Sequence, residues 1–344
     1  MNTTNNAFKK RGFSIGKYLY VLIFIALFIV YYLVSSSLTW TGVTNILRHS
    51  AAIGLVSFGM GLVIVTGDID LSVGSMLSFV ASFGCILFNI TDSIFLTVLF
   101  CLACGTLLGF LNGMMIGKAG MPAFIATLAT QLIFRSVAQY TCNSLPNDVK
   151  GVAGNTFKMI TTDARNTMYN FGNGKILTLP TCGVIFLLIA IFMIYLTTST
   201  KYGKRLFAIG SNVKAAHMAG INVAWNRVSV YTITGLLVGI AAVMWLAMQG
   251  NVDPATTGVG YEMYAIAAVV LGNISMSGGK GHFAGIVFGT LSYTIIDKII
   301  AAIKVDSLIN NAIKGLILII AIVIQICGPQ IRAWFINRKT ARGV

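Results

Sequence analysis

Long apolar stretches alternate with short polar segments along almost the whole chain. A helix that crosses the hydrocarbon core of a bilayer needs about 20 mostly apolar residues, and stretches of this length recur throughout the sequence. The pattern therefore predicts an all-α polytopic membrane protein with about ten transmembrane helices in a single domain. We place these helices near residues 18–36, 44–66, 70–89, 93–116, 121–142, 178–200, 225–249, 258–276, 280–301 and 308–327.

The amino-acid composition agrees with a membrane protein and limits the kinds of partner that we expect. Hydrophobic residues make up 56% of the 344 positions and charged residues only 10%, whereas a soluble domain carries about 25% charged residues. The net charge of +15 is compatible with nucleic-acid binding. However, the basic residues fall in short segments between apolar stretches, where they set the orientation of the spans. We therefore expect a lipid bilayer and no nucleic acid as partner.

The distribution of Lys and Arg predicts the orientation. Residues 1–17, 201–224 and 328–344 are rich in basic residues, so we place all three segments, and with them both termini, in the cytoplasm. Residues 143–177 are polar, carry several Asn and Thr, and are predicted to form an external loop.

The stretch VTGDIDLSVG, residues 65–74, carries two of the nine acidic residues of the chain. Acids within or beside spans are costly and suggest a function. Asp68 and Asp70 could bind a coupling ion, contact a polar solute, or cap a helix that starts near Leu71. The position just before an apolar helix favours capping, because carboxylates there accept free backbone N–H groups and complement the helix dipole.

A similar sequence occurs again further along the chain. A shift of 205 residues lays VTGDIDLSVG over VLGNISMSGG, residues 270–279. This weak internal repeat predicts two related halves, each with a glycine-broken hinge of the kind that transporters use at membrane depth. The candidate helix-break and gating residues are Gly67, Asp68, Asp70, Ser72, Gly74, Gly272, Gly278 and Gly279.

The basic loop 201–224 contains GSNVKAAHMAGIN, residues 210–222. Ser211 or Asn212 can cap a short helix, and Gly220 supplies a left-handed stop. A helix of about two turns is unstable alone in water. It must pack either into a groove of a partner protein or against its own chain, and these residues alone leave both readings open.

Four stretches together resemble the permease subunit of ribose-type ATP-binding-cassette importers, the family that handles monosaccharides and related solutes. They are GLVIVTGDIDLSVGS (61–75), MPAFIATLAT (121–130), KYGKRLFAIGSNVKAAHMAGINV (201–223) and GYEMYAIAAVVLGNISMSGGKG (260–281). The resemblance implies a permease domain in the bacterial inner membrane that pairs with a second copy or a sister permease. It also implies two cytoplasmic ATPases, and an extracytoplasmic binding protein that delivers the sugar.

The resemblance also assigns roles to residues. The family docks its ATPase through an E-A-A-x-x-x-G loop, which implies ATPase-coupling roles for Asn212, Lys214, Ala215, Ala216, His217 and Gly220. The chain lacks a phosphate-binding G-x-x-x-x-G-K-[ST] motif, so we expect ATP hydrolysis by a partner chain and no enzyme activity here. The histidines are isolated, and we assign no catalytic residue, cofactor or metal.

The chain departs from the family pattern at three positions. Asp68 stands where Gly is usual, Lys214 replaces the acid of the docking motif, and Tyr264 stands where an acid is common. Candidates for the solute path are the polar residues Asn112, Thr127, Gln131, Gln249 and Glu262. The leading prediction is the permease subunit of an ATP-driven, binding-protein-dependent importer of a simple sugar, either a ribose-like monosaccharide or a sugar-like solute. The alternative is a secondary transporter coupled to an ion through Asp68 and Asp70. A membrane enzyme is disfavoured, because it would need clustered His, Asp or Cys.

Overall fold

The computed structural model describes residues 19–35 and 39–303, together with residues 309, 312–316, 319–320 and 323. These parts are helical apart from short connections and two small pairs of strands. The helices are α1 (Leu19–Val34), α2 (Trp40–Val65), α3 (Val73–Thr91), α4 (Ile94–Gly113) with a π-helical continuation (Met114–Lys118), α5 (Ala123–Ser144), α6 (Asn147–Lys150), α7 (Asp163–Asn173), α8 (Thr181–Ser199), α9 (Lys201–Ser211), α10 (Val213–Met218), α11 (Val223–Gln249), α12 (Tyr261–Leu271) and α13 (Ala284–Ala302).

Six of these segments are long and apolar enough to cross a membrane, which confirms the prediction of an all-α polytopic membrane protein. They are Trp40–Val65, Val73–Thr91, Ile94–Lys118, Thr181–Ser199, Val223–Gln249 and Ala284–Ala302. Helices α1 and α5 occupy two further predicted positions, near 18–36 and 121–142. Most of the predicted last span, 308–327, lies outside the described residues.

The prediction of a full span over residues 258–276 is wrong. Helix α12 has only 11 residues, and at 1.5 Å per residue it is about 16 Å long, about half the thickness of the hydrocarbon core. It ends at Leu271, and beyond it Asn273 and then Gly278, Gly279 and Gly281 take left-handed backbone conformations that do not continue a helix. The predicted start of the third span at residue 70 is also too early, since the chain is not helical between Val65 and Val73.

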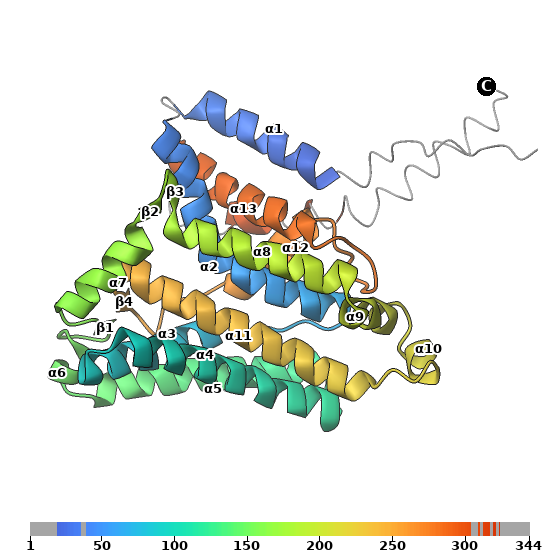
Figure 1. The fold of residues 1–344 in the computed structure, drawn as a ribbon, viewed down its shortest axis with the longest axis horizontal. Coiled ribbons are helices and arrows are strands. Elements are labelled where there is room, and N and C mark those ends of the chain that lie inside the picture. Colours follow the sequence, from blue (N-terminus) through green and yellow to red (C-terminus); the bar gives the residue numbers. More distant parts are fainter. Residues whose placement is uncertain are drawn as a thin grey trace, which may run out of the picture.

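The long helices α2, α4, α5, α8 and α11 run roughly alongside one another between two ends of the molecule (Figure 1). One end carries α9 and α10. The other carries α6, α7 and the strands β1 (Phe157–Lys158), β2 (Lys175–Ile176), β3 (Leu179–Pro180) and β4 (Asn251–Val252). Antiparallel pairing of β1 with β4 and of β2 with β3 closes this end. The polar segment 143–177 is thus folded, although the sequence predicted only a loop.

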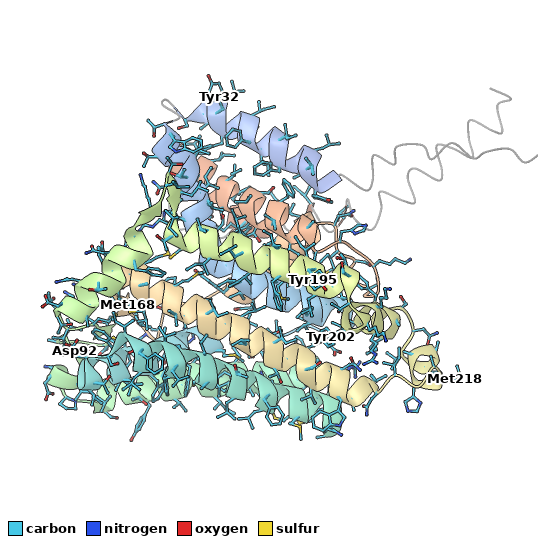
Figure 2. The ribbon with its side chains drawn as sticks, viewed as in Figure 1. Tyr32, Asp92, Met168, Tyr195, Tyr202 and Met218 are labelled. Atoms are coloured by element: carbon cyan, nitrogen blue, oxygen red, sulfur yellow. The ribbon has the colours of Figure 1, made fainter. Side chains whose placement is uncertain are left out.

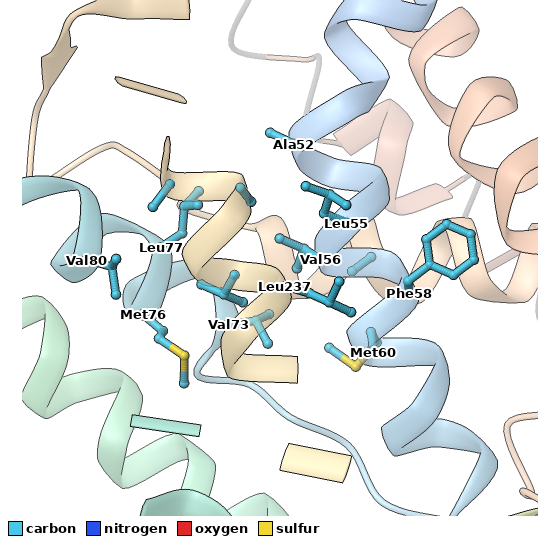
Figure 3. Close-up of a cluster of buried hydrophobic side chains, with 14 of the residues drawn as sticks. Ala52, Leu55, Val56, Phe58, Met60, Val73, Met76, Leu77, Val80 and Leu237 are labelled. Atoms are coloured by element: carbon cyan, nitrogen blue, oxygen red, sulfur yellow. The ribbon is translucent and has the colours of Figure 1, made fainter. Parts of the chain in front are cut away.

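The core is built around α2. Every residue of α2 from Ala51 to Val65 is buried, since α2 packs against α8, α11, α12 and α13. Figure 3 shows side chains of α2 such as Leu55 and Val56 beside Leu237 and the α3 side chains Val73 and Leu77. A helix that is apolar on all sides is typical of such a central position.

Among the described helices, α4 and α11 make the most extensive contact, and four glycines allow it. A Cβ atom on Gly105 or Gly109 of α4 would overlap the backbone of Gly235 in α11, and one on Gly235 or Gly239 would overlap the backbone of α4. Small residues at a spacing of four let two helix backbones approach closely. The resulting van der Waals contact stabilises the helix pair, because there is no hydrophobic driving force between helices surrounded by lipid.

Candidate functional site

The stretch between α2 and α3, residues 66–72, is a connecting segment that enters the protein interior instead of lying on its surface. Gly67 turns the chain with φ +89°, a conformation that residues with a Cβ rarely adopt. Beyond the turn, Asp70 and Ser72 are almost completely buried, with exposed fractions of 1% and 0%. Their polar groups must therefore find partners within the protein.

The connecting segment itself supplies some of these partners, and helices α4 and α5 supply the others. The Asp70 carboxylate accepts hydrogen bonds from the backbone N–H of Ser72 at 2.8 Å and from its hydroxyl at 2.6 Å. The side-chain amide of Asn112 in α4 donates to the Ser72 hydroxyl oxygen at 2.9 Å. The Thr127 hydroxyl in α5 accepts from the backbone N–H of Leu71 at 3.1 Å. These bonds fix the connecting segment between α4 and α5.

Asp68 has a different role from the predicted one. Its carboxylate lies 3.2 Å from the guanidinium of Arg227 in α11, so it forms an ion pair and does not cap α3. Helix α3 begins only at Val73, and Asp70 bonds to the residue just before it. Burial raises the pKa of the Asp68 carboxyl, and the charge of Arg227 opposes this shift. Burial also raises the pKa of Asp70 to about 6, against the two hydrogen bonds from Ser72.

The second broken stretch, residues 272–283, meets the first. The backbone N–H of Gly279 donates to the carbonyl of Val65 at 2.9 Å, and the hydroxyl of Ser211 in α9 donates to the Gly279 carbonyl at 3.4 Å. Gly278 lies against Gly67 and takes φ +78°. Three of the predicted helix-break residues thus come together at the end of the molecule that carries α9 and α10. We call this place the glycine junction, formed by Val65, Gly67, Ser211, Gly278 and Gly279.

The other predicted helix-break glycines lie elsewhere. A Cβ on Gly272 would overlap the backbone of Gly285 in α13, so Gly272 permits the close crossing of α12 and α13. Gly74, the second residue of α3, lies against the carboxylate of Glu262 and the backbone of Gly258. The first turns of α3 and α12 therefore meet inside the protein. Their gating role stays a prediction.

The five candidates for the solute path are dispersed. Asn112 and Thr127 are fully buried and bond to the connecting segment, so contact with solute would require that segment to move. Gln131 is half-buried on α5, and Gln249 is exposed as the last residue of α11. Glu262 is buried at the start of α12.

Sequence reasoning missed Arg135, which holds the loop before α12. Its guanidinium donates to the carbonyls of Pro254 at 2.9 Å and Thr257 at 2.5 Å. The sequence did point to this residue, because placing an arginine inside an apolar stretch costs free energy unless its side chain has such partners.

The short helix predicted in the basic loop is α10. The side chain of Asn212 accepts from the N–H of Ala215 at 3.0 Å, and Gly220 ends the turn with φ +78°. Lys214, Ala215 and His217 are exposed, whereas Ala216 is only 3% exposed. Ala216 therefore attaches α10 to its own chain, where it packs on α9 and α11. Figure 2 shows Met218 on α10 at the tip of this end of the molecule, with Asp92 near the opposite end.

Comparisons with known proteins agree with this geometry. Residues 42–322 match the family described as branched-chain amino acid transport system / permease component. The ribose import permease of Bacillus subtilis is 35% identical over 88% of this chain and 91% of its own length. The ribose import permease of Escherichia coli K12 is 31% identical over 82% of this chain and 84% of its own.

A third relative transports another sugar. The fructose import permease of Bifidobacterium longum is 33% identical over 87% of this chain and 81% of its own. No solved structure matches the chain. The family match covers nearly all described residues, including the connecting segment, the glycine junction and α10. The chain therefore belongs to the family of permease components of the branched-chain amino acid transport system.

Proposed function

We propose that this protein is the membrane-spanning permease subunit of an ATP-driven importer that takes up a monosaccharide from an extracytoplasmic binding protein. The observation that carries the proposal is the similarity to ribose import permeases along almost the whole chain. Relatives named for fructose and allose import extend the same chemistry to other small neutral sugars. The subunit performs no covalent chemistry, and it alternates access across the bacterial inner membrane with both termini in the cytoplasm.

Helix α10 is the element we propose for docking of the ATPase. Its exposed residues Val213, Lys214, His217 and Met218 point away from the chain, and Met218 is 82% exposed. A large apolar side chain at the tip of a short helix suits insertion into a groove of a partner. Ala216 is buried against its own chain, and the glycine junction lies nearby. A movement of α10 would therefore be transmitted to α12 and α2.

The charge at the end of the molecule that carries α9 and α10 indicates the chemistry of the groove on the ATPase. Among the described residues, six basic side chains are exposed on and around α9 and α10, namely Lys118, Lys201, Lys204, Arg205, Lys214 and Lys280. Of the acids at the same end, Asp68 is paired with Arg227 and Asp70 is buried. We infer that the ATPase presents an apolar pocket surrounded by acidic residues. These acidic residues would pair with Lys214, which stands where the family's docking motif has an acid.

The alternative of an ion-coupled secondary transporter through Asp68 and Asp70 has little support. Both carboxylates already have partners within the protein, Arg227 for Asp68 and Ser72 for Asp70. A secondary transporter would also have no use for an exposed docking helix.

Uptake into proteoliposomes tests the proposal. The permease is reconstituted with its co-purifying ATPase and binding protein, and uptake of radiolabelled D-ribose, D-fructose and D-allose is measured with ATP inside the vesicles. We expect ATP-dependent uptake of one of these sugars, and none with a proton or sodium gradient alone. Uptake driven by an ion gradient without ATP would refute the importer reading.

A charge-reversal pair tests the docking surface. Lys214→Glu should weaken the association with the ATPase about tenfold at low salt, because it places a carboxylate opposite the acidic residues of the ATPase. Lys158→Glu, at the opposite end of the molecule, is the matched control and should leave the association unchanged. Equal effects of both variants would show that α10 does not contact the ATPase.

A further inference from the structure

Two adjoining cavities lie between α12 and α13, away from the connecting segment. The larger has a volume of about 410 Å³ and is lined by Met263, Tyr264, Ala267, Tyr293 and Lys314 among others. The smaller, of about 260 Å³, shares Tyr264 and Tyr293 with the first. Ligand sites in proteins are concave and mostly apolar, with a few convergent polar groups and volumes of about 300–1,000 Å³. The larger cavity meets this description. We call the pair the tyrosine cavity.

The walls of the tyrosine cavity carry a row of aromatic side chains. The ring centres of Tyr261 and Tyr264 are 6.0 Å apart, and those of Tyr264 and Tyr293 are 5.1 Å apart. Trp245 of α11 extends the row with its ring centre 6.2 Å from that of Tyr261. Aromatic faces carry partial negative charge, so they attract the weakly positive C–H groups on one face of a saturated, hydroxylated ring. The tyrosine hydroxyls add hydrogen-bonding groups beside these faces.

Three Asp and Lys side chains line the two cavities, and two of them, Lys314 and Asp297, are paired while Lys298 is the third. The ammonium of Lys314 lies 2.8 Å from the carboxylate of Asp297 and 4.8 Å from the centre of the Tyr264 ring. The paired Lys314 and Asp297 offer donors and acceptors side by side, and the Lys298 ammonium adds further donors. This composition suits a solute that carries several hydroxyl groups, since each hydroxyl can accept from an ammonium and donate to a carboxylate.

The depth of the cavity also argues for a function. Tyr293 lies about halfway along α13, one of the membrane-crossing helices, and Asp297 is one turn further on. Ionisable residues at such a depth are costly and mark solute or ion pathways by default.

Helix α12 connects the tyrosine cavity with the docking end. Tyr264 stands in its first turn, and its last residue, Leu271, leads directly into the stretch 272–283 that forms part of the glycine junction. The distance along the helix from Tyr264 to Leu271 is only about 10 Å. A solute that shifts α12 at one end would therefore move the contact with Val65 and Ser211 at the other.

We propose that the tyrosine cavity is a transient binding site for a neutral polyhydroxylated solute on its way through the permease. The proposal rests on the importer function proposed above, since that function supplies the solute. Tyr264 and Tyr293 form the stacking surface, and the Lys314–Asp297 pair supplies the hydrogen bonds.

Chemical protection tests the site without transport. Met263→Cys places a thiol at the rim of the cavity, where residue 263 is 58% exposed. Its rate of maleimide labelling is measured on the assembled complex in lipid nanodiscs, with the unsubstituted chain as background. We expect D-ribose, D-fructose or D-allose at high concentration to slow labelling at least threefold. Leu177→Cys, in the turn between β2 and β3 with 97% exposure, is the control and should be labelled at the same rate with and without sugar.

Transport kinetics provide the second readout. Tyr264→Ala should raise the KM for uptake by about 2- to 13-fold, the range that loss of an aromatic contact of about 0.5–1.5 kcal/mol gives. Tyr264→Phe keeps the ring and should retain most of the uptake. Assembly of each variant with the ATPase checks that the chain is folded.

The outcomes separate the two proposals. Protection by a sugar without any ATP-driven uptake would support the site and refute the importer function. ATP-driven uptake with neither protection at residue 263 nor a change in KM for Tyr264→Ala would refute the site alone. A labelling rate that depends on the lipid headgroups but on none of the sugars would mean that lipid occupies the cavity, and the proposal would be wrong.

Discussion

The pairing of Asp68 with Arg227 makes a quantitative prediction about stability. The two side chains are partly buried, with exposed fractions of 12% for Asp68 and 27% for Arg227. Breaking a fully buried pair costs about 3–5 kcal/mol, whereas an exposed pair contributes about 0–1 kcal/mol. The pair is intermediate in burial, so removing one partner should cost about 1–3 kcal/mol.

The two single variants should differ. Arg227→Gln leaves the less exposed Asp68 carboxylate without its partner, and we expect a loss of about 2–3 kcal/mol. Asp68→Asn leaves the guanidinium, whose long side chain can extend towards water, and we expect about 1 kcal/mol. The double variant should recover about 1–2 kcal/mol of the summed losses, because no unpaired charge remains.

A double-mutant cycle measures this directly. The four chains are purified in the same mild detergent, and the free energy of unfolding is obtained from reversible denaturation curves under identical conditions. Lys214→Gln is the control, since Lys214 is exposed and has no ion-pair partner among the described residues. Additive losses, with a coupling energy below about 0.5 kcal/mol, would show that the ion pair does not hold the connecting segment.

Three further predictions concern packing and local bonds. Gly235→Leu should prevent the close contact of α4 and α11 and abolish the folded protein in detergent, while Gly42→Ala, which has room for a Cβ, should fold normally in size-exclusion chromatography. Asn112→Ala should cost about 1–3 kcal/mol in denaturation experiments, because the Ser72 hydroxyl loses a buried donor; a change below about 0.3 kcal/mol would contradict this. Thr39→Ala should cost about 1 kcal/mol, since the Thr39 hydroxyl caps α2 at the N–H of Gly42; unchanged stability would show that this cap is dispensable.

The sequence alone determined the class of the protein and several local features. Apolar stretches of about 20 residues predicted the membrane helices, because the thickness of the bilayer sets their length directly. The caps of α10 were also readable, since Asn212 and Gly220 act through backbone groups within a few residues of themselves. The repeat of 65–74 at 270–279 predicted a glycine-broken hinge in each stretch, and the structure has non-helical stretches there, at 66–72 and 272–283.

Only the tertiary structure decided which distant residues are partners. Asp68 was predicted as a cap and is paired with Arg227, which is 159 positions away in the sequence. Hydropathy predicted a full span over 258–276, but α12 is short because several left-handed residues follow it, and no average of hydropathy detects backbone conformation. The tyrosine cavity joins α12 to α13 and Lys314, and such a site depends on how helices pack. Membrane thickness and capping act locally and can be read from the chain, whereas ion pairs and cavities depend on distances that only folding sets.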